Sequence, residues 1–190
     1  MVESDRPASE IAMERGIKRN QLYKWKEQMA KKGAVERVKE KRVADSQVEV
    51  GQVMQPEDTN PAGNVHGGTI MKMVDNAAAV VASRHCRRNV VTASIDRMNF
   101  HNPVYLGDLV FLKASLNWVG RTSMVIGVRV EAEELTTGKR THTASAYLTF
   151  VALDEKGKPY PVPQLALESP EEEKRFQNTI SRSACIRQNE

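Results

Sequence analysis

The sequence contains only two cysteines, Cys86 and Cys185, and aromatic residues make up 5% of its 190 residues. Two isolated cysteines exclude a disulfide framework as the basis of the fold, so reduced thiols are expected. No run approaches the roughly 18 consecutive apolar residues of a membrane helix, and residues 1–30 lack the apolar stretch of a signal peptide. We therefore expect a soluble, cytoplasmic protein without a membrane partner.

The positive charge of the chain is confined to its N-terminal quarter. The formal net charge is +4, and residues 1–45 hold 12 Lys and Arg against 8 Asp and Glu. Residues 46–190 are therefore formally neutral. This contrast indicates a boundary near residue 45, and the length of the chain fits one domain plus an appendage.

One helical run and several strand-like runs follow that boundary. Residues 66–86 are rich in Ala and Met and carry apolar residues at helical spacing, which predicts a single central helix. The runs 90–100, 109–119, 123–135 and 142–153 have the length and β-branched composition of strands, and residues 48–54 are a fifth candidate. Turn signals at hairpin spacing predict an antiparallel sheet. The pattern favours an α+β fold in which the sheet curls around the helix.

The C-terminal part of the chain carries signals that end the sheet. Three prolines, at 159, 161 and 163, cannot donate hydrogen bonds within a central strand ladder. Ser169-Pro170 followed by three glutamates predicts the start of a short surface helix. We therefore expect a basic appendage at 1–45, a sheet-and-helix domain at 46–165, and a helical tail at 166–190.

A glycine-rich loop, residues 60–68, leads directly into the predicted helix. Gly67 and Gly68 let a ligand approach the backbone closely, and the N–H groups at a helix start attract developing negative charge. The loop is therefore a candidate oxyanion-binding site. The alternative is a loop that only turns the chain.

Asp75 lies within a run of small and apolar residues on the predicted helix, and Ala78, Ala79 and Ala82 share its face. An aspartate on a close-packed face is costly unless it is paired or used, and burial of a carboxyl group favours general-base behaviour. The alternative places Asp75 on the solvent side of an amphipathic helix. Gly67 and Asp75 would lie about 12 Å apart along the helix. If both act on one substrate, a site shared between two subunits is expected, and hence a dimer.

Five motifs, at 63–75, 82–86, 91–94, 120–123 and 150–153, recur in this order in a known family. The chain resembles hotdog-fold acyl-CoA thioesterases, specifically the bacterial cytoplasmic acyl-CoA hydrolases and each half of the double-hotdog cytosolic acyl-CoA hydrolases of animals. The resemblance covers about residues 46–178. It implies a hotdog fold and the hydrolysis of acyl-CoA to CoA and a carboxylic, usually fatty, acid.

The resemblance also implies roles for individual residues. Asp75 would act as general base or nucleophile, Asn64 would position the water or the carbonyl, and the N–H groups of Gly67 and Gly68 would stabilise the oxyanion. His66 would help to polarise the carbonyl, or would only cap the helix. The catalytic Asn and Asp of the double-hotdog relatives come from different halves, which implies a homodimer with two sites, within a trimer of dimers. No metal and no cofactor other than the CoA of the substrate is implied.

The family uses a short motif near the CoA phosphates, and Arg121, Thr122 and Ser123 match it. The planar guanidinium of arginine suits bidentate contacts with phosphate. Arg88 is a further candidate. The alternative is that residues 120–123 form an ordinary hairpin turn and that Arg88 is an ordinary solvated charge.

Residues 8–29 show helix-turn-helix spacing and resemble the DNA-binding segment of insertion-element transposases. The segment is either a fusion remnant or a DNA-binding appendage. A rival function is therefore an acyl-CoA-sensing DNA-binding transcription regulator. Asn64 and Asp75 favour the enzyme, because a sensor has no need of hydrolytic groups.

Overall fold

The computed structural model describes residues 40–187, and the side chains of all of these except Arg97 and residues 182–187. The helix-turn-helix predicted for residues 8–29 lies outside the described residues. Among the described helices, none is both long and apolar enough to cross a bilayer.

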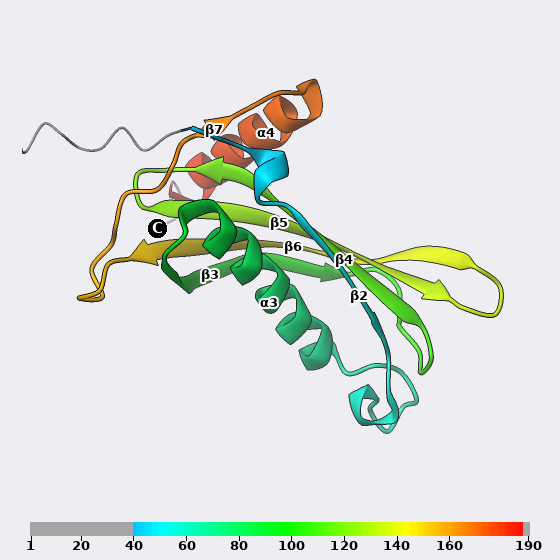
Figure 1. Ribbon diagram of the computed structural model, residues 1–190. Coiled ribbons are helices and arrows are strands. Elements are labelled where there is room, and N and C mark those ends of the chain that lie inside the picture. The colour runs from blue at the N-terminus through cyan, green and yellow to red at the C-terminus, as the bar shows by residue number, and fades with distance from the viewer. Residues whose placement is uncertain (1–39, 188–190) are drawn as a thin grey trace, which may run out of the picture. The chain divides into compact units, whose positions relative to one another are not determined.

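The described chain forms seven strands, two α-helices and two 3-10 helices. In order they are β1 (Lys41–Arg42), η1 (Val43–Asp45), β2 (Val48–Val53), η2 (Pro56–Asp58), α3 (Gly67–Cys86), β3 (Asn89–Phe100), β4 (Leu109–Val119), β5 (Ser123–Glu134), β6 (Lys139–Leu153), β7 (Leu165–Ala166) and α4 (Pro170–Arg187). Five of the strands form an antiparallel sheet in the order β2-β4-β5-β6-β3, and α3 lies across one face of it (Figure 1). The predicted central helix and antiparallel sheet are confirmed.

The central helix α3 has clear signals at both ends. His66 caps the N-terminus, because its Nδ1 accepts the Gly68 N–H at 2.9 Å. At the C-terminus Arg87 adopts a left-handed conformation with φ 53°, and its N–H bonds to the Ser83 carbonyl at 2.8 Å. Between these ends one apolar stripe is buried, and its alanines let the helix approach the sheet closely. The stripe consists of Ile70, Val74, Ala77, Ala78, Val81 and Ala82.

The core lies between this stripe and the alternate residues of β4, β5 and β6. Those strands show a period-two burial pattern, as expected of a sheet with one face against a helix. The largest fully buried side chains of the three strands include Leu112, Leu116, Ile126, Leu148 and Phe150. The other positions of the strands point to the opposite face, which is called the outer face below.

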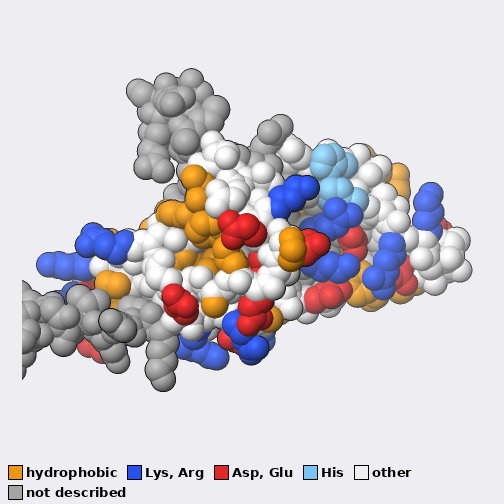
Figure 2. Space-filling model, turned by 90° about the horizontal axis from the view of Figure 1, so that it is seen from above, with side chains coloured by type: hydrophobic (Ala, Val, Ile, Leu, Met, Phe, Trp, Pro, Cys, Tyr) orange, Lys and Arg blue, Asp and Glu red, His pale blue; other side chains and the backbone are white. Residues whose placement is uncertain are grey.

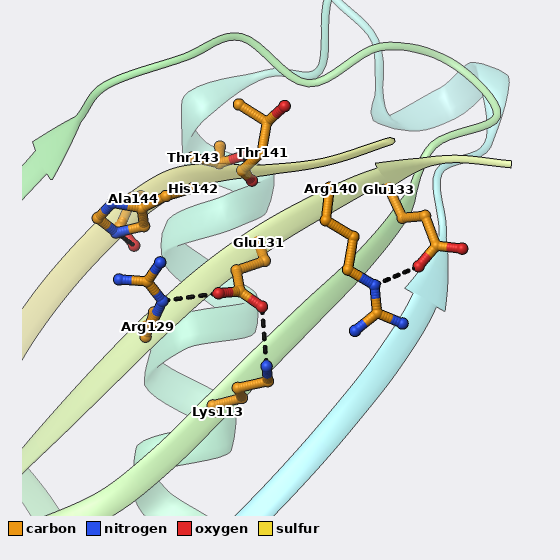
Figure 3. Close-up of polar contacts among 9 residues, drawn as sticks. All are labelled: Lys113, Arg129, Glu131, Glu133, Arg140, Thr141, His142, Thr143 and Ala144. Carbon is orange, nitrogen blue, oxygen red and sulfur yellow. Dashed lines mark hydrogen bonds and ion pairs between the residues drawn. The ribbon is translucent and has the colours of Figure 1, made fainter. Parts of the chain in front are cut away.

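The outer face carries ion pairs along β5 and between β5 and its neighbours β4 and β6. Glu131 bonds both to Lys113 at 2.8 Å and to Arg129 at 2.7 Å (Figure 3). The hydrogen bonds from Lys113 and Arg129 lower the pKa of Glu131 to about 2. Figure 3 also shows the pair of Arg140 and Glu133, and the Arg140 guanidinium lies 4.3 Å from the centre of the Phe111 ring. Pairs between strands stabilise the ends of a hairpin even where the sequence has no hydrophobic pattern to indicate a strand.

That pairing accounts for one difference from prediction. β6 begins at Lys139, three residues before the predicted start at 142, because polar residues such as Arg140 find partners across the hairpin. A second difference is the C-terminal helix, which the sequence predicted to be short. α4 spans 18 residues, from Pro170 to Arg187.

Residues 41–45 belong to the described fold, which therefore begins on the N-terminal side of the boundary expected near residue 45. β1 pairs in parallel with β7, and Val43 is buried. The Lys41 Nζ donates to the carbonyl oxygens of His85 at 2.6 Å and Arg84 at 3.1 Å. A lysine at these carbonyls complements the negative end of the α3 dipole. Lys41 was counted among the basic residues of the appendage, yet its ammonium group stabilises the C-terminus of α3.

His85, in the last turn of α3, is fully buried and joins the helix to two distant segments. Its Nε2 lies 2.8 Å from the Pro163 carbonyl oxygen, and its Nδ1 lies 3.3 Å from the Ser46 Oγ, which is itself buried. Burial lowers the pKa of His85 from its ordinary value of 6.5. The folded protein therefore holds the neutral imidazole.

The burial of His85 makes the free energy of unfolding depend on pH. Between the folded pKa of His85 and about 6.5, the unfolded chain binds more protons than the folded one, so stability falls as pH is lowered through this window and is unaffected above it. Each unit of pKa difference corresponds to about 1.4 kcal/mol. We expect His85→Gln to lose less unfolding free energy than wild type between pH 7.5 and pH 5.5, as measured by urea denaturation. Equal losses in the two proteins would contradict this role.

Candidate functional site

A cleft of about 360 Å³ opens beside the N-terminus of α3, between the loop before the helix and the segment after β3. It contains two of the predicted site residues, Asn64 and Gly67. The lining residues are Asn60, Asn64, Val65, Gly67, Ile70, Phe100, His101, Asn102, Pro103, Val104 and Thr143.

The loop is held in shape by Asn60. Its Oδ1 accepts the Ala62 N–H at 2.8 Å, and its Nδ2 donates to the Oδ1 of Asn64. The Asn60 N–H also bonds to the Asn64 carbonyl at 2.8 Å, and Gly63 closes the turn with φ +85°. The two carboxamides therefore form one unit at the cleft. The family resemblance pointed to Asn64, and no pattern in the sequence marked Asn60.

The two glycines at the helix start differ in what their N–H groups do. The Gly68 N–H already donates to the His66 Nδ1. It is therefore not available to an oxyanion, in contrast to the prediction. The Gly67 N–H has no acceptor among the described residues, and Gly67 lines the cleft. Gly67 also lies against the Phe100 ring, since a Cβ built there would be 3.7 Å from Cζ. The open donor of this helix start is the N–H of Gly67.

For His66, the structure has the capping geometry that the sequence left as one of two alternatives. The ring nitrogen that faces the helix is occupied by the Gly68 N–H. The side chain does not line the cleft.

Asp75 lies two turns further along α3 and does not line the cleft. It is half-buried rather than fully buried in the single chain, whereas its neighbours Ala78 and Ala82 are fully buried. Its Oδ1 accepts a hydrogen bond from the Thr92 Oγ1, on β3, at 2.7 Å. One chain alone therefore leaves Asp75 apart from Gly67. Thr92 was part of a family motif in the sequence but was given no role.

β3, which carries Thr92, is an edge of the sheet. Within the part of the chain that the structure describes, it pairs with β6 on one side and has no strand on the other. Several apolar side chains on β3 are exposed: Val91 by 42%, Ile95 by 41% and Phe100 by 51%. An open strand edge with exposed apolar side chains is typical of a surface covered by another chain.

The predicted CoA-binding residues gather at the opposite end of the molecule. The carbonyl oxygens of Arg121 and Thr122 accept the N–H groups of Val162 and Ala152, both at 3.0 Å. The Arg88 guanidinium stacks at 3.8 Å over the ring of Tyr160. Ser123 begins β5 beside them.

The N–H of Tyr160 bonds to the Ala152 carbonyl, which joins Arg88 to the Arg121 turn. These residues lie near the C-terminus of α3, whereas the cleft is lined by Gly67 at the N-terminus of the helix. Figure 1 shows the two ends of α3 on opposite sides of the sheet's length. The helix between them is about 30 Å long. A single chain therefore keeps the candidate CoA-binding residues away from Gly67.

No group of three or more His, Cys, Asp or Glu residues among residues 40–187 has the arrangement of a metal site.

Comparisons with protein families give two matches. A model of the thioesterase superfamily matches residues 62–139, and a transposase model matches residues 1–55. The second match contains the predicted transposase-like residues 8–29 and runs on through β2. The transposase resemblance is thus confirmed at the level of sequence.

Two curated relatives each match about 70% of the chain. The uncharacterized acyl-CoA thioester hydrolase YkhA of Bacillus subtilis is 45% identical over 134 residues, which cover 70% of this chain and 77% of that protein. The cytosolic acyl coenzyme A thioester hydrolase of Rattus norvegicus is 41% identical over 137 residues, 71% of this chain but 36% of that protein. The chain thus spans about a third of the length of the rat protein.

Solved structures share the fold. An apo-hexameric acyl-CoA thioesterase superposes with a TM-score of 0.77 at 36% identity, covering 80% of this chain and 97% of that one. An acyl-CoA hydrolase from Staphylococcus aureus, in complex with butyryl coenzyme A, coenzyme A and coenzyme A disulfide, gives a TM-score of 0.73 at 32% identity, covering 78% and 91%.

Three further structures of the S. aureus enzyme carry alanine in place of one asparagine, one aspartate or one threonine. They are 31% identical to this chain, with TM-scores of 0.69 to 0.74. In that enzyme the replaced asparagine precedes the replaced aspartate by 15 residues, and the replaced threonine follows the aspartate by 17.

Proposed function

The chain belongs to the thioesterase superfamily and has the hotdog fold, and we propose that it hydrolyses acyl-CoA thioesters to free CoA and a carboxylic acid. The relatives named above carry this activity in their names, at 41% and 45% identity. The observation that carries the proposal is the hydrogen-bonded pair of Asp75 and Thr92, because it repeats the aspartate–threonine spacing of the S. aureus variants. No comparable observation favours the transcription regulator, and DNA binding by residues 8–29 stays a prediction.

The same spacing bears on the catalytic asparagine. Asn60 precedes Asp75 by 15 residues, as the replaced asparagine does in the S. aureus enzyme, whereas Asn64 precedes it by 11. We therefore assign the positioning of water or carbonyl to Asn60, with Asn64 as the partner that orients its carboxamide. This revises the role that the family resemblance suggested for Asn64.

Each group in the proposed site has a defined task. The carboxylate of Asp75 takes a proton from water, whose oxygen forms a bond to the thioester carbonyl carbon. Thr92 holds that carboxylate by the hydrogen bond at 2.7 Å. The carbonyl oxygen becomes an oxyanion, which accepts a hydrogen bond from the Gly67 N–H. As the oxyanion re-forms the carbonyl, the carbon–sulfur bond breaks and its electron pair leaves with the CoA sulfur. The thiolate takes up the proton that Asp75 removed from water, which restores the carboxylate.

A second copy of the chain would bring the separated groups together. Antiparallel pairing of β3 with the β3 of a second copy, about a two-fold axis, sets the C-terminal end of one strand beside the N-terminal end of the other. Phe100 and Gly67 of one protomer then lie near Asp75 and Thr92 of its partner. The same pairing carries the partner's Arg88 and Arg121 toward the cleft, where they would bind CoA phosphates. The open edge of β3 and the hexameric state of the structural neighbour support this arrangement.

The activity can be tested by the release of free thiol from a panel of acyl-CoAs of different chain lengths. Wild type is expected to release thiol from at least one of them. Asn60→Ala should lower kcat/KM by about 10²-fold or more, since it removes the carboxamide to which we assign the positioning of the water or the carbonyl. Asn64→Ala should have a smaller effect, because Asn60 keeps its own bond to the Ala62 N–H.

Two results would count against these assignments. Absence of thiol release from every acyl-CoA by the full-length wild type would contradict the proposed activity. A larger loss in Asn64→Ala than in Asn60→Ala would return the catalytic role to Asn64.

A further inference from the structure

Two histidine rings lie together beside the cleft at the N-terminus of α3, and the proposed hydrolysis uses neither of them. The centre of the His101 ring, just after β3, lies 4.9 Å from the centre of the His142 ring, on β6, and the ring planes are tilted by 40°. Figure 2 shows histidine side chains together at the surface, next to basic side chains. An aromatic pair at this distance is attractive, so the two rings join the end of β3 to β6.

His101 begins the segment 101–104, which lines one side of the cleft. The N–H group of His101 donates to the Thr143 carbonyl, on β6, at 2.8 Å. At the other end, the Val104 carbonyl accepts the Val65 N–H, from the loop before α3, also at 2.8 Å. The only ionisable side chain of the segment is that of His101. Because the segment connects β6 to the loop, a displacement of its first residue would change the shape of the cleft.

His142 is the fixed member of the pair. Its Nε2 lies 3.1 Å from the Ala144 carbonyl oxygen and 2.9 Å from the Ser145 Oγ. A carbonyl oxygen only accepts hydrogen bonds, so Nε2 carries a hydrogen in the neutral ring as well as in the charged one, and a further proton binds at Nδ1. The His101 ring, in contrast, has the stacking contact but no side-chain hydrogen bond among the described residues. His101 is therefore the ring that can move.

The charges around the pair leave a positive excess. On β5, Glu131 stands opposite His142 in the register of the two strands (Figure 3). Its carboxylate is shared by Lys113 and Arg129, and the hydrogen bonds from both keep the pKa of Glu131 at about 2. These three groups therefore carry one net positive charge throughout the neutral and weakly acidic range. On β6 itself, Arg140 is already paired with a carboxylate of β5.

Imidazole is the side chain that ordinarily changes its charge between about pH 5 and pH 8. One proton on the pair leaves a charged ring beside a neutral one, without repulsion between the rings. A second proton places two like charges 4.9 Å apart in surroundings that are already positive, and this repulsion opposes the stacking.

We propose that His101 and His142 are positioning residues for the proposed hydrolysis, on which this inference rests: they hold the segment 101–104 against β6 until both rings are protonated. Separation of the charged rings displaces the segment from its place beside Gly67 and lowers the rate of hydrolysis. The loss falls in the pH range in which imidazole gains its charge.

The test compares kcat/KM at pH 7.5 and pH 5.5, followed by the loss of thioester absorbance, for the acyl-CoA that wild type hydrolyses best. Protonation of Asp75 lowers the activity of every variant alike. Wild type is expected to lose about three- to tenfold more, the factor that an aromatic contact of this kind contributes. His142→Phe keeps a ring against His101 that cannot be charged, so it should not show this additional loss.

His142→Ala is the matched control, because it loses the same Nε2 hydrogen bonds as His142→Phe but has no ring. Its kcat/KM should already be about three- to tenfold below that of His142→Phe at pH 7.5, and it should show no additional loss at pH 5.5. Equal activities of the two variants at pH 7.5 would overturn the proposal. An acid loss in His142→Phe as large as that of wild type would overturn it as well.

Hydrogen exchange of residues 100–105 gives a measurement that does not depend on activity. After correction for the intrinsic effect of pH on exchange, wild type should be less protected there at pH 5.5 than at pH 7.5, and His142→Phe equally protected at both. Equal changes in the two proteins would contradict the proposal. If no acyl-CoA is hydrolysed, the proposed activity fails, and exchange alone decides on the histidine pair. Circular dichroism at both pH values verifies folding, since the burial of His85 makes stability depend on pH.

Discussion

Combining two inactive variants, Asp75→Ala and Asn60→Ala, is expected to restore about a quarter of the wild-type activity. Each variant alone should lose about 10²- to 10⁴-fold in kcat, the usual contribution of a general base or a positioned polar group. If each site takes Asp75 from one protomer and the loop from its partner, half of the dimers are mixed, and each mixed dimer has one intact site. The measurement is thiol release from the co-expressed and co-purified variants.

The control for this experiment uses two residues that contact each other in one chain. Asp75 and Thr92 are joined by a hydrogen bond, so Asp75→Ala mixed with Thr92→Ala leaves every site with at least one defect. No recovery above the activity of Thr92→Ala homodimers is expected there. Absence of recovery in both mixtures would mean that Asp75 works with the loop of its own chain.

Replacement of Gly67 by proline is expected to lower kcat by about 10²- to 10³-fold while leaving the fold intact. Proline is well tolerated at the first position of a helix, and the preceding residue, His66, already has the extended conformation that proline requires, with ψ 129°. The substitution therefore removes one N–H group and little else. Because the Gly68 N–H is held by His66, no neighbouring donor would replace it.

Gly67→Ala is the matched control. It keeps the N–H, and its Cβ would meet only the Phe100 ring at an ordinary contact distance of 3.7 Å. We expect its kcat to stay within a few-fold of wild type. If Gly67→Pro and Gly67→Ala have similar activities, the oxyanion donor lies elsewhere. Circular dichroism and thermal melts show whether both variants are folded.

Local patterns in the sequence predicted most of the fold. The bounds of β4 agree with the predicted strand at 109–119. Apolar and polar residues alternate along this run, and a turn signal at Gly120 ends it. α3 was predicted within one residue, since His66 and Arg87 end it by local capping. The sequence assigned Lys41 to the basic appendage rather than to the folded domain. Its partners, the carbonyls of Arg84 and His85, lie more than forty residues away along the chain, so no local pattern indicates them.

The candidate site was predicted less completely than the fold. The sequence located the loop and Asp75, and from the rise of a helix it predicted that they lie apart in one chain. It could not show which glycine N–H is already bonded, because that depends on the orientation of the His66 ring. It also passed over Asn60 and Thr92, whose importance comes from hydrogen bonds to Asn64 and Asp75 rather than from any pattern of their own.

The open edge of β3 has a consequence for how the protein behaves in dilute solution. A lone protomer presents unpaired backbone groups flanked by Val91, Ile95 and Phe100, which is a template for adding further strands. Dissociation would then lead to aggregation as well as to inactive monomers, and recovery on reconcentration would be incomplete. The same surface that completes a catalytic site would also make the lifetime of the enzyme depend on its own concentration.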